Sequence, residues 1–367
     1  MKIVVTVASL HGGGAEYVAR TWMGWLARRG HHVQAVLTGR SADPAFVPEG
    51  VQVRSLAGHA GQFGKVRALR AILRQEKPDV ALSLQMHSNL TLLSAARLLA
   101  KSERPRIFIS ERNLVSLGLN GADRRHRLKV KMAKWSYRKA DGVVAISHPV
   151  AGELVAGFRV PGQRIYVVPN PATAKVSLPS NAKTQKITNE AADLLTIVLP
   201  CRLVAQKRPE LALSTAAELT RRGIKTEVRS FGDGPLLAAM TARAQQLGVR
   251  FDHRGWVENW YEAEGPSTHV VLLPSSREGF GNVLVEAAAA GLPSVAVSGA
   301  LGVADAVVPG ITGELALTAD PADLADAVLS AARVDLSQAV TWLERFSEEK
   351  SGRMLEQVLS RVGTERG

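Results

Sequence analysis

Two carboxylates at a Gly-rich turn have the spacing that most clearly points to chemistry. Glu278 stands before the turn, and Glu286 stands about two turns into the apolar helical pattern that follows. Backbone N–H groups around Gly281 and Val283 would open this helix, where they favour phosphate. We expect the carboxylates to accept hydroxyl groups from one elongated ligand whose phosphates meet the helix start. Acid–base catalysis of the glycosidase kind is the alternative, and the helix-interior position of Glu286 disfavours it.

Two further segments could contact an anion. Arg202 and Lys207 follow an apolar run and can both face a ligand from one loop, Arg by binding two oxygens and Lys as a point charge. This suits a pyrophosphate, and a solvated basic loop is the alternative. Residues 11–16 follow the first apolar run and include three consecutive glycines that let a backbone approach a ligand closely. A plain tight turn is the alternative here, because the G-x-G-x-x-G fingerprint is absent.

These residues must be positioned by short apolar runs that alternate with amphipathic segments, a pattern typical of βαβ units and parallel sheets. Expected strands are 2–8, 32–37, 51–55, 79–84, 106–110, 142–146, 195–200, 225–231, 249–254, 269–273 and 294–297. Expected helices are 16–29, 65–75, 89–101, 124–139, 209–222, 235–247, 282–290, 321–333 and 347–362. We expect an α/β protein with two Rossmann-like domains.

A polar segment without aromatics separates the two series of strands and reads as a linker. The expected organisation is a first domain, a linker, a second domain and a terminal helix that packs back across the domains, over residues 1–172, 173–194, 195–346 and 347–367. Ligands of open parallel sheets bind at the carboxyl ends of the strands. We therefore expect the site in the cleft between the two domains.

The turn and its neighbours resemble the retaining glycosyltransferases of family 4, which have the GT-B fold and an E-x7-E motif. The resemblance covers nearly the whole chain, and seven motifs agree in order and spacing. Besides Glu278–Glu286, the similar segments are 168–171, 201–208, 231–235, 255–257, 273–275, 291–293 and 310–314. Cys201 stands where the family usually has Gly, and residues 110–113 resemble a turn of a bacterial cell-surface subset that builds glycans or glycolipids.

The resemblance implies a role for each matching residue. Arg202 and Lys207 would neutralise the donor diphosphate, Glu278 would hold the transferred sugar and Glu286 the ribose. Further donor contacts would come, largely through backbone, from Gly13, Gly14, Gly255, Trp256, Val257, Gly279, Phe280, Gly281, Asn282 and Val283. On the acceptor side, Glu111, Arg112 and His87 are the candidates, although a loop histidine with a structural role is the slightly favoured interpretation of His87. The family retains anomeric configuration and needs no metal or other cofactor, which agrees with the absence of D-x-D from the sequence.

Charge, Cys content and the length of the apolar runs limit which classes of protein this chain can belong to. The 367 residues carry a net charge of +13, of which residues 1–175 hold +17 and residues 176–367 hold −4. The single Cys201 excludes an intramolecular disulfide framework and a Cys-cluster metal site. Apolar runs are too short to span a membrane, and the first run reads as a strand and not as a signal peptide. We expect a reducing, cytoplasmic setting.

Much of the positive charge lies in one segment that reads as a helix. Its candidate membrane-surface residues are Arg124, Arg125, Arg127, Lys129, Lys131, Lys134 and Trp135. Leu128, Met132 and Trp135 form one apolar stripe among these cations. In one interpretation the stripe packs on the domain and the cations are solvated. In the other, the face lies on the anionic inner leaflet of the membrane. Nucleic acid ranks third, because no recognised module accompanies the charge.

The favoured function is a transferase that moves a sugar from a nucleotide sugar to a glycan, lipid-linked or small-molecule acceptor. UDP-sugars are favoured over guanosine donors by family frequency alone. The protein would be cytoplasmic or peripheral on the inner face of the membrane. Alternatives are a GT-B-fold nucleotide-sugar epimerase or hydrolase, and a basic binding protein with a degenerate transferase fold. The intact Arg202, Lys207, Glu278 and Glu286 argue against the last.

Overall fold

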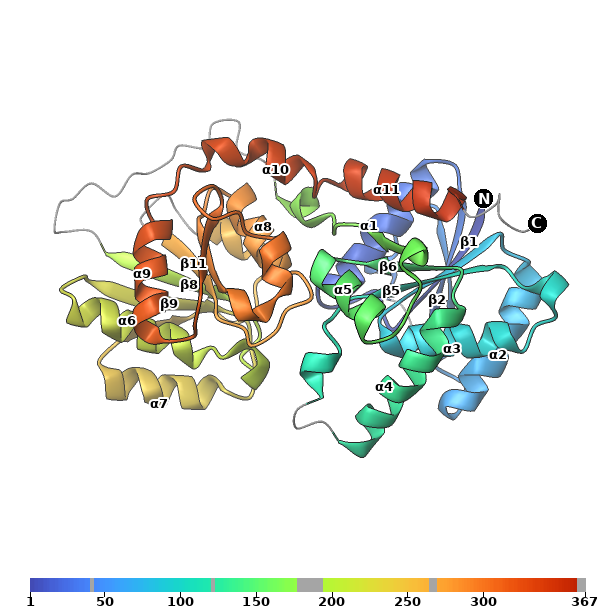
Figure 1. The fold of residues 1–367 in the computed structure, drawn as a ribbon, viewed down its shortest axis with the longest axis horizontal. Coiled ribbons are helices and arrows are strands. Elements are labelled where there is room, and N and C mark those ends of the chain that lie inside the picture. Colours follow the sequence, from blue (N-terminus) through green and yellow to red (C-terminus); the bar gives the residue numbers. More distant parts are fainter. Residues whose placement is uncertain (40–42, 120–122, 177–193, 264–268, 362–367) are drawn as a thin grey trace. The chain divides into compact units, whose positions relative to one another are not determined.

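The structure is a computed structural model that describes residues 1–39, 43–119, 123–176, 194–263 and 269–361. The chain forms two compact units (Figure 1). Unit 1 comprises residues 1–171 together with 347–367, and unit 2 comprises residues 172–346. Most of the expected linker, 173–194, lies outside the described residues.

The described part of unit 1 is built on a parallel sheet of seven strands in the order β3-β2-β1-β4-β5-β6-β7. Buried Val and Ile runs form most of these strands, as expected for a sheet covered on both faces. Their bounds are β1 Lys2–Val7, β2 His32–Leu37, β3 Val51–Ser55, β4 Val80–Leu84, β5 Arg106–Glu111, β6 Gly142–Ala145 and β7 Ile165–Val167. The sheet is the expected one, with β7 as an additional short strand at its edge.

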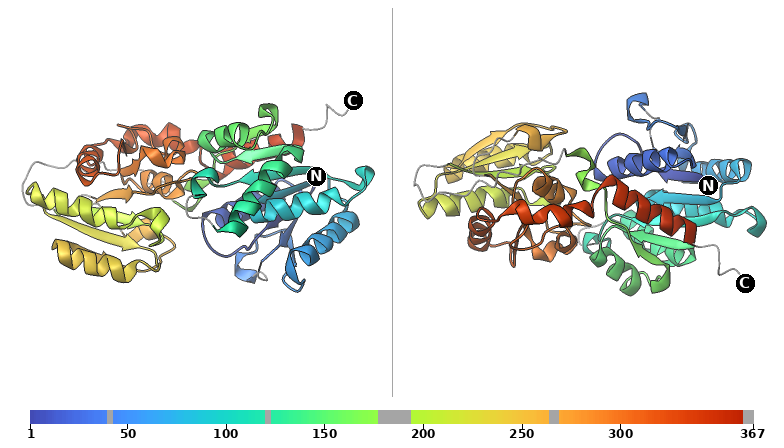
Figure 2. Two further views of the ribbon diagram at one scale, coloured as in Figure 1. Left: turned by 60° about the horizontal axis from the view of Figure 1, so that its bottom comes forward. Right: turned by 90° about the horizontal axis from the view of Figure 1, so that it is seen from above.

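The helices of unit 1 come from both ends of the chain. They are α1 Gly14–Arg28, α2 Gly61–Glu76, α3 Met86–Arg97, α4 Arg124–Ser136, α5 His148–Ala156 and α11 Glu348–Arg361. Helix α11 lies along α1 (Figure 2), where the indole of Trp22 donates to Ser351 Oγ at 2.8 Å. Gly352 makes this contact close, because a Cβ there would lie 2.4 Å from the Trp25 ring. Leu355 and Leu359 extend the core of unit 1 on this side.

Unit 2 has a second parallel sheet, of six described strands in the order β10-β9-β8-β11-β12-β13. The strands are β8 Leu195–Pro200, β9 Thr226–Phe231, β10 Arg250–His253, β11 His269–Leu273, β12 Ser294–Val297 and β13 Gly313–Ala316. The described helices are α6 Glu210–Arg221, α7 Leu237–Leu247, α8 Asn282–Ala289, α9 Pro321–Ala331 and α10 Val340–Glu344. The expected α/β architecture with two Rossmann-like parallel sheets is therefore confirmed.

Strand order locates the edge of each sheet where a ligand is best placed. In unit 1 the order reverses between β1 and β4, and in unit 2 it reverses between β8 and β11. A crevice opens at such a point, at the carboxyl ends of the strands, because the connections on its two sides run in opposite directions. The segments that follow these four strands carry most of the residues singled out in the sequence.

Candidate active site

In unit 2, charged side chains from the segments after β8 and β11 come together. Lys207 Nζ forms an ion pair with Glu278 Oε1, and both side chains are largely buried. Arg202 is exposed on the same loop. All three charges act on the Cys201 thiol, although burial dominates and raises the pKa of that thiol to about 12. The sequence placed Arg202 and Lys207 on one loop and Glu278 on another, and the structure brings the two loops together at the carboxyl end of the sheet.

Backbone contacts fix the Gly-rich turn that carries Glu278. The Glu278 N–H donates to the Ala300 carbonyl at 3.0 Å. Arg208 donates to the carbonyls of Pro274 at 2.8 Å and Ser275 at 2.9 Å. Gly302 lies against the turn so closely that a Cβ would stand 2.3 Å from the Glu278 carbonyl oxygen. The carboxylate is therefore held on a rigid support.

Glu286 lies in α8, and its carboxylate is buried. Trp260 donates its indole N–H to Glu286 Oε2 at 3.2 Å. Burial raises the pKa of Glu286, while nearby Lys175 and the indole act in the opposite direction. Trp260 is a site residue that the sequence did not identify. Its only local signal is its place four residues after Trp256, in the segment already expected to frame the base.

Helix α8 begins at the turn that the sequence identified. Gly281 precedes it with φ +101°, a conformation that glycine adopts without strain. Gly279 and Phe280 are buried, and the Phe280 ring packs on Phe346 with ring centroids 5.3 Å apart. Asn282 and Val283 are half-buried in the first turn of the helix.

Two glycine-rich turns support the neighbouring segments of unit 2. Gly232 donates its N–H to the Gly255 carbonyl at 2.6 Å, which ties the end of β9 to the segment after β10. Beyond Gly255, Trp256 is 68% exposed and Val257 37% exposed. Gly234 lies under the loop that carries Arg202, because a Cβ there would stand 2.3 Å from the Leu203 carbonyl oxygen.

In unit 1, the segments after β1 and β4 meet. Gly13 and Gly14 are exposed at the start of α1. Gln85 caps α3 with φ +73° and ψ +146°, a strained backbone for a residue with a side chain, and its Nε2 donates to Glu16 Oε1 at 3.4 Å. His87 is exposed in the first turn of α3, and its pKa lies below the ordinary value because of partial desolvation and the nearby Lys129 and Lys65. Gln85 was not anticipated from the sequence.

Glu111 ends β5 inside a buried polar network. It is 2% exposed and accepts hydrogen bonds from Tyr137 Oη at 2.7 Å and from the Arg112 N–H at 2.9 Å. Burial raises the pKa of Glu111 to about 6. Arg112 is also buried, hydrogen-bonded to the Asn170 side chain, and burial lowers its pKa to about 9. This placement suits a residue that positions its neighbours.

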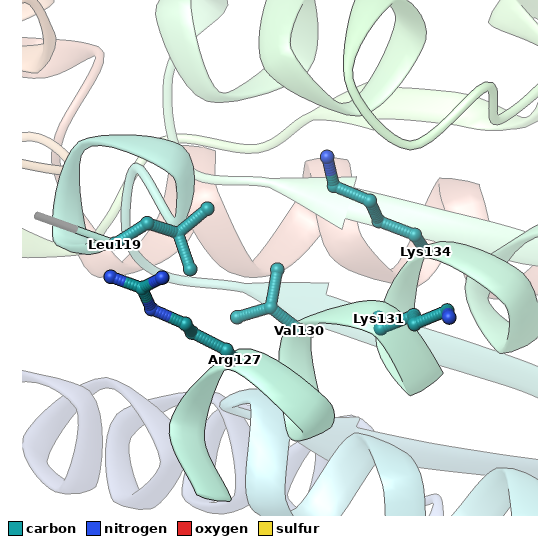
Figure 3. A pocket seen from close by; sticks show the side chains of 5 residues that line it. All are labelled: Leu119, Arg127, Val130, Lys131 and Lys134. Atoms are coloured by element: carbon teal, nitrogen blue, oxygen red, sulfur yellow. The ribbon is translucent and has the colours of Figure 1, made fainter. Parts of the chain in front are cut away.

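The basic segment forms α4 (Figure 3), and the side chains that it buries are not those of the apolar stripe. Val130 and Ala133 are buried against the unit. Leu128, Met132 and Trp135 are 59%, 48% and 47% exposed. The interpretation in which this stripe packs on the domain is therefore wrong. The small side chains meet the core, and the large apolar ones face solvent among the cations.

Metal-ligating clusters and membrane-spanning helices are both absent from the described residues. No group of three His, Cys, Asp or Glu side chains within them is arranged to hold a metal ion. No helix within them has both the length and the apolar character needed to cross a membrane.

Solved structures with the same architecture define the fold class. The lipopolysaccharide outer core galactosyltransferase WaaB, in its apo form, is 20% identical over 98% of this chain and 99% of its own, with a TM-score of 0.77. Anabaena Alr3699/HepE in complex with UDP and glucose is 19% identical over 98% and 99%, with a TM-score of 0.72. The protein has the GT-B fold of these glycosyltransferase structures.

Sequence families narrow the class. Residues 12–174 match the Glycosyltransferase Family 4 model, and residues 195–333 match the model of Glycosyl transferases group 1. The chain belongs to the family-4 type of glycosyltransferases. A Schizosaccharomyces pombe relative, the phosphatidylinositol N-acetylglucosaminyltransferase gpi3 subunit, is 28% identical over 60% of this chain and 46% of its own. The chain spans about half the length of the curated relatives it matches.

Proposed function

We propose that the protein is a retaining glycosyltransferase that moves a sugar from a nucleoside diphosphate sugar, with UDP as the favoured nucleotide. The observation that carries this proposal is the grouping of Arg202, Lys207 and Glu278 at the carboxyl end of the unit 2 sheet. Two cations and one carboxylate on rigid loops suit a ligand that has a diphosphate at one end and hydroxyl groups at the other. The UDP and glucose bound to the Alr3699/HepE structure support this choice of donor.

In the proposed reaction the cations and the carboxylate have separate roles. When the bond between sugar and phosphate breaks, negative charge grows on the diphosphate, and Arg202 and Lys207 are already in place to stabilise it. Lys207 forms an ion pair with Glu278 in the structure. A bound donor would exchange this pair, giving the ammonium to phosphate and the carboxylate to sugar hydroxyls. The positive charge that the reaction needs then comes from side chains and not from a metal ion.

Glu286 and Trp260 would hold the nucleoside. The buried Glu286 carboxylate has one oxygen bonded to the Trp260 indole, which fixes its orientation. Its other oxygen is then available to the two ribose hydroxyls. Gly255, Trp256 and Val257 would frame the base, and Gly13 and Gly14 would approach the donor from unit 1. Glu111 acts as a positioning residue and His87 as the accessible acceptor-side candidate.

The acceptor would be a glycan, a lipid-linked group or a small molecule, and α4 favours the membrane surface. Three exposed apolar side chains surrounded by cations suit an anionic leaflet, where each cation near the surface contributes about 1 kcal/mol. The lipid acceptor named for the Schizosaccharomyces pombe relative supports this choice. The protein would then work at the inner face of the membrane.

Nucleotide binding tests the donor site directly. UDP should raise the melting temperature more than GDP or ADP, because a ligand of the native state stabilises it by RT ln(1 + [L]/Kd). Arg202→Ala and Lys207→Ala should each weaken UDP binding by about 10-fold or more, the value of one charged hydrogen bond. Arg243→Ala is the control, since Arg243 is an exposed cation on α7 of the same unit.

The outcomes separate the proposed function from its alternatives. Wild-type affinity in both site variants would refute the assignment of the diphosphate contacts. Arg202 is exposed, so a loss in Arg202→Ala would not reflect a folding defect. Retained anomeric configuration in the product, with donor turnover that depends on an acceptor, is expected. Turnover without any acceptor would instead indicate a hydrolase or epimerase.

A further inference from the structure

Two loops of unit 2 are joined by side chains that have no role in the proposed donor chemistry. Lys207 lies on the loop after β8, and Glu278 lies on the loop after β11. Gln206 and Arg208 stand directly before and after Lys207, and both form hydrogen bonds with the residues directly before Glu278. Those residues are Pro274, Ser275, Ser276 and Arg277. We call the two residues and their partners the loop clamp.

The Arg208 guanidinium binds the part of the second loop that directly follows β11. Its Nε donates to the Pro274 carbonyl at 2.8 Å, and its Nη2 donates to the Ser275 carbonyl at 2.9 Å. One planar fork thus binds two successive carbonyls, a geometry that the single ammonium of Lys does not reproduce. Desolvation lowers the pKa of Arg208, while Glu210 acts in the opposite direction. The guanidinium is therefore used on the backbone that leads to Glu278.

Gln206 binds the part of the same loop that lies nearest Glu278. Its carbonyl accepts hydrogen bonds from the Ser276 N–H at 2.9 Å and from the Ser276 hydroxyl at 3.1 Å. Its side chain pairs with Arg277 in both directions. Nε2 donates to the Arg277 carbonyl at 3.1 Å, and Oε1 accepts from Arg277 Nη2 at 3.4 Å. The loop clamp therefore ends one residue away from both members of the ion pair.

The backbone at Arg208 lets two neighbouring side chains serve different partners. Its φ of +45° and ψ of +51° are left-handed, a conformation that residues with a side chain seldom adopt. The Lys207 N–H donates to the Val204 carbonyl at 2.8 Å, and the Arg208 N–H donates to the Ala205 carbonyl at 3.2 Å. With the loop fixed in this way, Lys207 Nζ pairs with Glu278 while Arg208 binds the carbonyls. Such a backbone persists only where the surrounding contacts hold it.

The loop clamp matters because the proposed donor must break the ion pair. Lys207 would then bind the diphosphate, and Glu278 would bind sugar hydroxyls. The six hydrogen bonds of the clamp involve neither Lys207 Nζ nor the Glu278 carboxylate, so they can persist when the pair separates. Charged groups that keep their places in this way stabilise a transition state without reorganisation.

We propose that Gln206 and Arg208 are positioning residues, which hold Lys207 and Glu278 at the spacing that a nucleoside diphosphate sugar requires. The inference rests on the proposed function and specifies what keeps its two donor loops together once the ion pair is broken. Neither residue has to touch the donor. Because Arg208 acts through Lys207, its removal should have no further effect on UDP binding once Lys207 is absent.

A double-mutant cycle in UDP binding, measured by calorimetry, tests this dependence. Arg208→Gly removes the guanidinium, and Gly adopts the left-handed backbone without strain, so the variant should fold. It should weaken UDP binding about three- to tenfold, and no more than Lys207→Ala does. Arg208→Gly/Lys207→Ala should bind UDP within about twofold of Lys207→Ala alone. Arg208→Lys keeps the charge but not the fork, and it should lose as much affinity as Arg208→Gly.

Two further variants complete the cycle. Gln206→Ala removes the side-chain contacts of Gln206 but not those of its carbonyl, so it should show the same dependence on Lys207 with a loss of about two- to threefold. The control is Arg222→Ala. Arg222 binds Glu218 at 2.8 Å and precedes β9, at the opposite edge of the same sheet. This variant should keep the wild-type affinity for UDP.

Three outcomes would overturn the proposal. Losses that multiply in Arg208→Gly/Lys207→Ala would mean that Arg208 acts independently of Lys207. Wild-type affinity in Arg208→Lys would favour direct attraction between the charge of Arg208 and the diphosphate. Wild-type affinity in Arg208→Gly would mean that the loop clamp is not needed for binding.

The ion pair offers a second measurement that needs no ligand. Urea unfolding of Lys207→Ala, Glu278→Gln and their combination gives the coupling between the two side chains. This coupling should be about tenfold or more in the unfolding equilibrium constant, and it should fall to about twofold or less when Arg208→Gly is added. An undiminished coupling would overturn the loop clamp. Absence of UDP binding from the wild-type protein would instead refute the proposed transferase, and the coupling would still decide whether the clamp holds the pair.

Discussion

Replacing Glu111 by Gln should remove a defined part of the pH dependence of stability. Glu111 is buried at the end of β5, and its pKa is raised to about 6 from an ordinary value of 4.5, with desolvation as the largest cause. The folded state therefore binds the proton more tightly than the unfolded state does. The stabilising contribution is complete below pH 4.5 and is lost as the pH rises through 6.

The size of the effect follows from the shift. The difference between about 6 and 4.5 corresponds to about 2 kcal/mol, at 1.36 kcal/mol for each pKa unit. Gln is neutral at every pH and can accept the hydrogen bond that Tyr137 now donates to the carboxylate at 2.7 Å. Relative to Glu111→Gln, the wild-type protein should therefore lose about 2 kcal/mol of unfolding free energy between pH 4.5 and pH 7.5.

Urea unfolding of the full chain at a series of pH values measures this difference. The two proteins share every other titrating group, so subtraction at equal pH isolates the contribution of Glu111. Glu49→Gln is the control, because it removes an exposed carboxylate from the same unit. An additional infrared measurement should find a carboxylic acid band near pH 5 that is missing from Glu111→Gln. A difference that stays constant between pH 4.5 and pH 7.5 would refute the reasoning, because it would mean that Glu111 titrates alike in both states.

Two further predictions concern the surface and the site support. The triple change Leu128→Ser, Met132→Ser and Trp135→Ser should weaken binding to anionic vesicles on the order of 100-fold, at about 1 kcal/mol for each side chain that is half inserted into the membrane. The control is Phe63→Ser on α2, where Phe63 is 88% exposed, and it should leave vesicle binding unchanged. Equal losses in the two variants would argue against a specific membrane-binding face. Gly234→Ala should destabilise unit 2 by about 1–3 kcal/mol and lower UDP affinity, because its Cβ would stand 2.3 Å from the Leu203 carbonyl oxygen. Gly299→Ala meets no atom within 4 Å, and a similar thermal shift in both glycine variants would contradict this explanation.

Buried strands were the most predictable part of the fold. The expected bounds of β2, β3, β8, β11 and β12 agree with the structure, because each is a Val-, Ile- or Leu-containing run that ends at a polar or turn residue. Strands β7 and β13 were missed. They have three and four residues, and most of their positions are only half-buried, so neither gives a clear apolar run.

Helix α5 was missed although its start signal is present in the sequence. Ser147 caps it and accepts a hydrogen bond from the Val150 N–H at 3.3 Å, and Pro149 stands in its first turn. Both are ordinary helix-start residues. Among its nine residues only Val150 and Leu154 are buried, so the apolar pattern is too short to indicate a helix.

The site was predictable where it depends on local spacing and not where it depends on distant contacts. The charged residues of the two loops in unit 2 were identified from their sequence positions. The ion pair between Lys207 and Glu278, the indole that holds Glu286 and the strained Gln85 each depend on segments far apart in the chain or on a backbone angle. The period of α4 was visible as well. The face of α4 that packs on the unit could not be predicted, because the large apolar residues indicated the wrong face and the core accepts only the small ones.

The place of α11 has a consequence for how the chain is made. Unit 1 is discontinuous, so residues 1–171 leave the ribosome well before the segment that covers Trp22 and Trp25. At about 5–20 residues per second, this interval lasts roughly 10–35 seconds, during which the apolar face of α1 has no partner. Unit 2 is contiguous and can finish folding within the same interval. The first unit to be synthesised is therefore the last to be completed, and its uncovered helix is a natural point for chaperone binding or for aggregation.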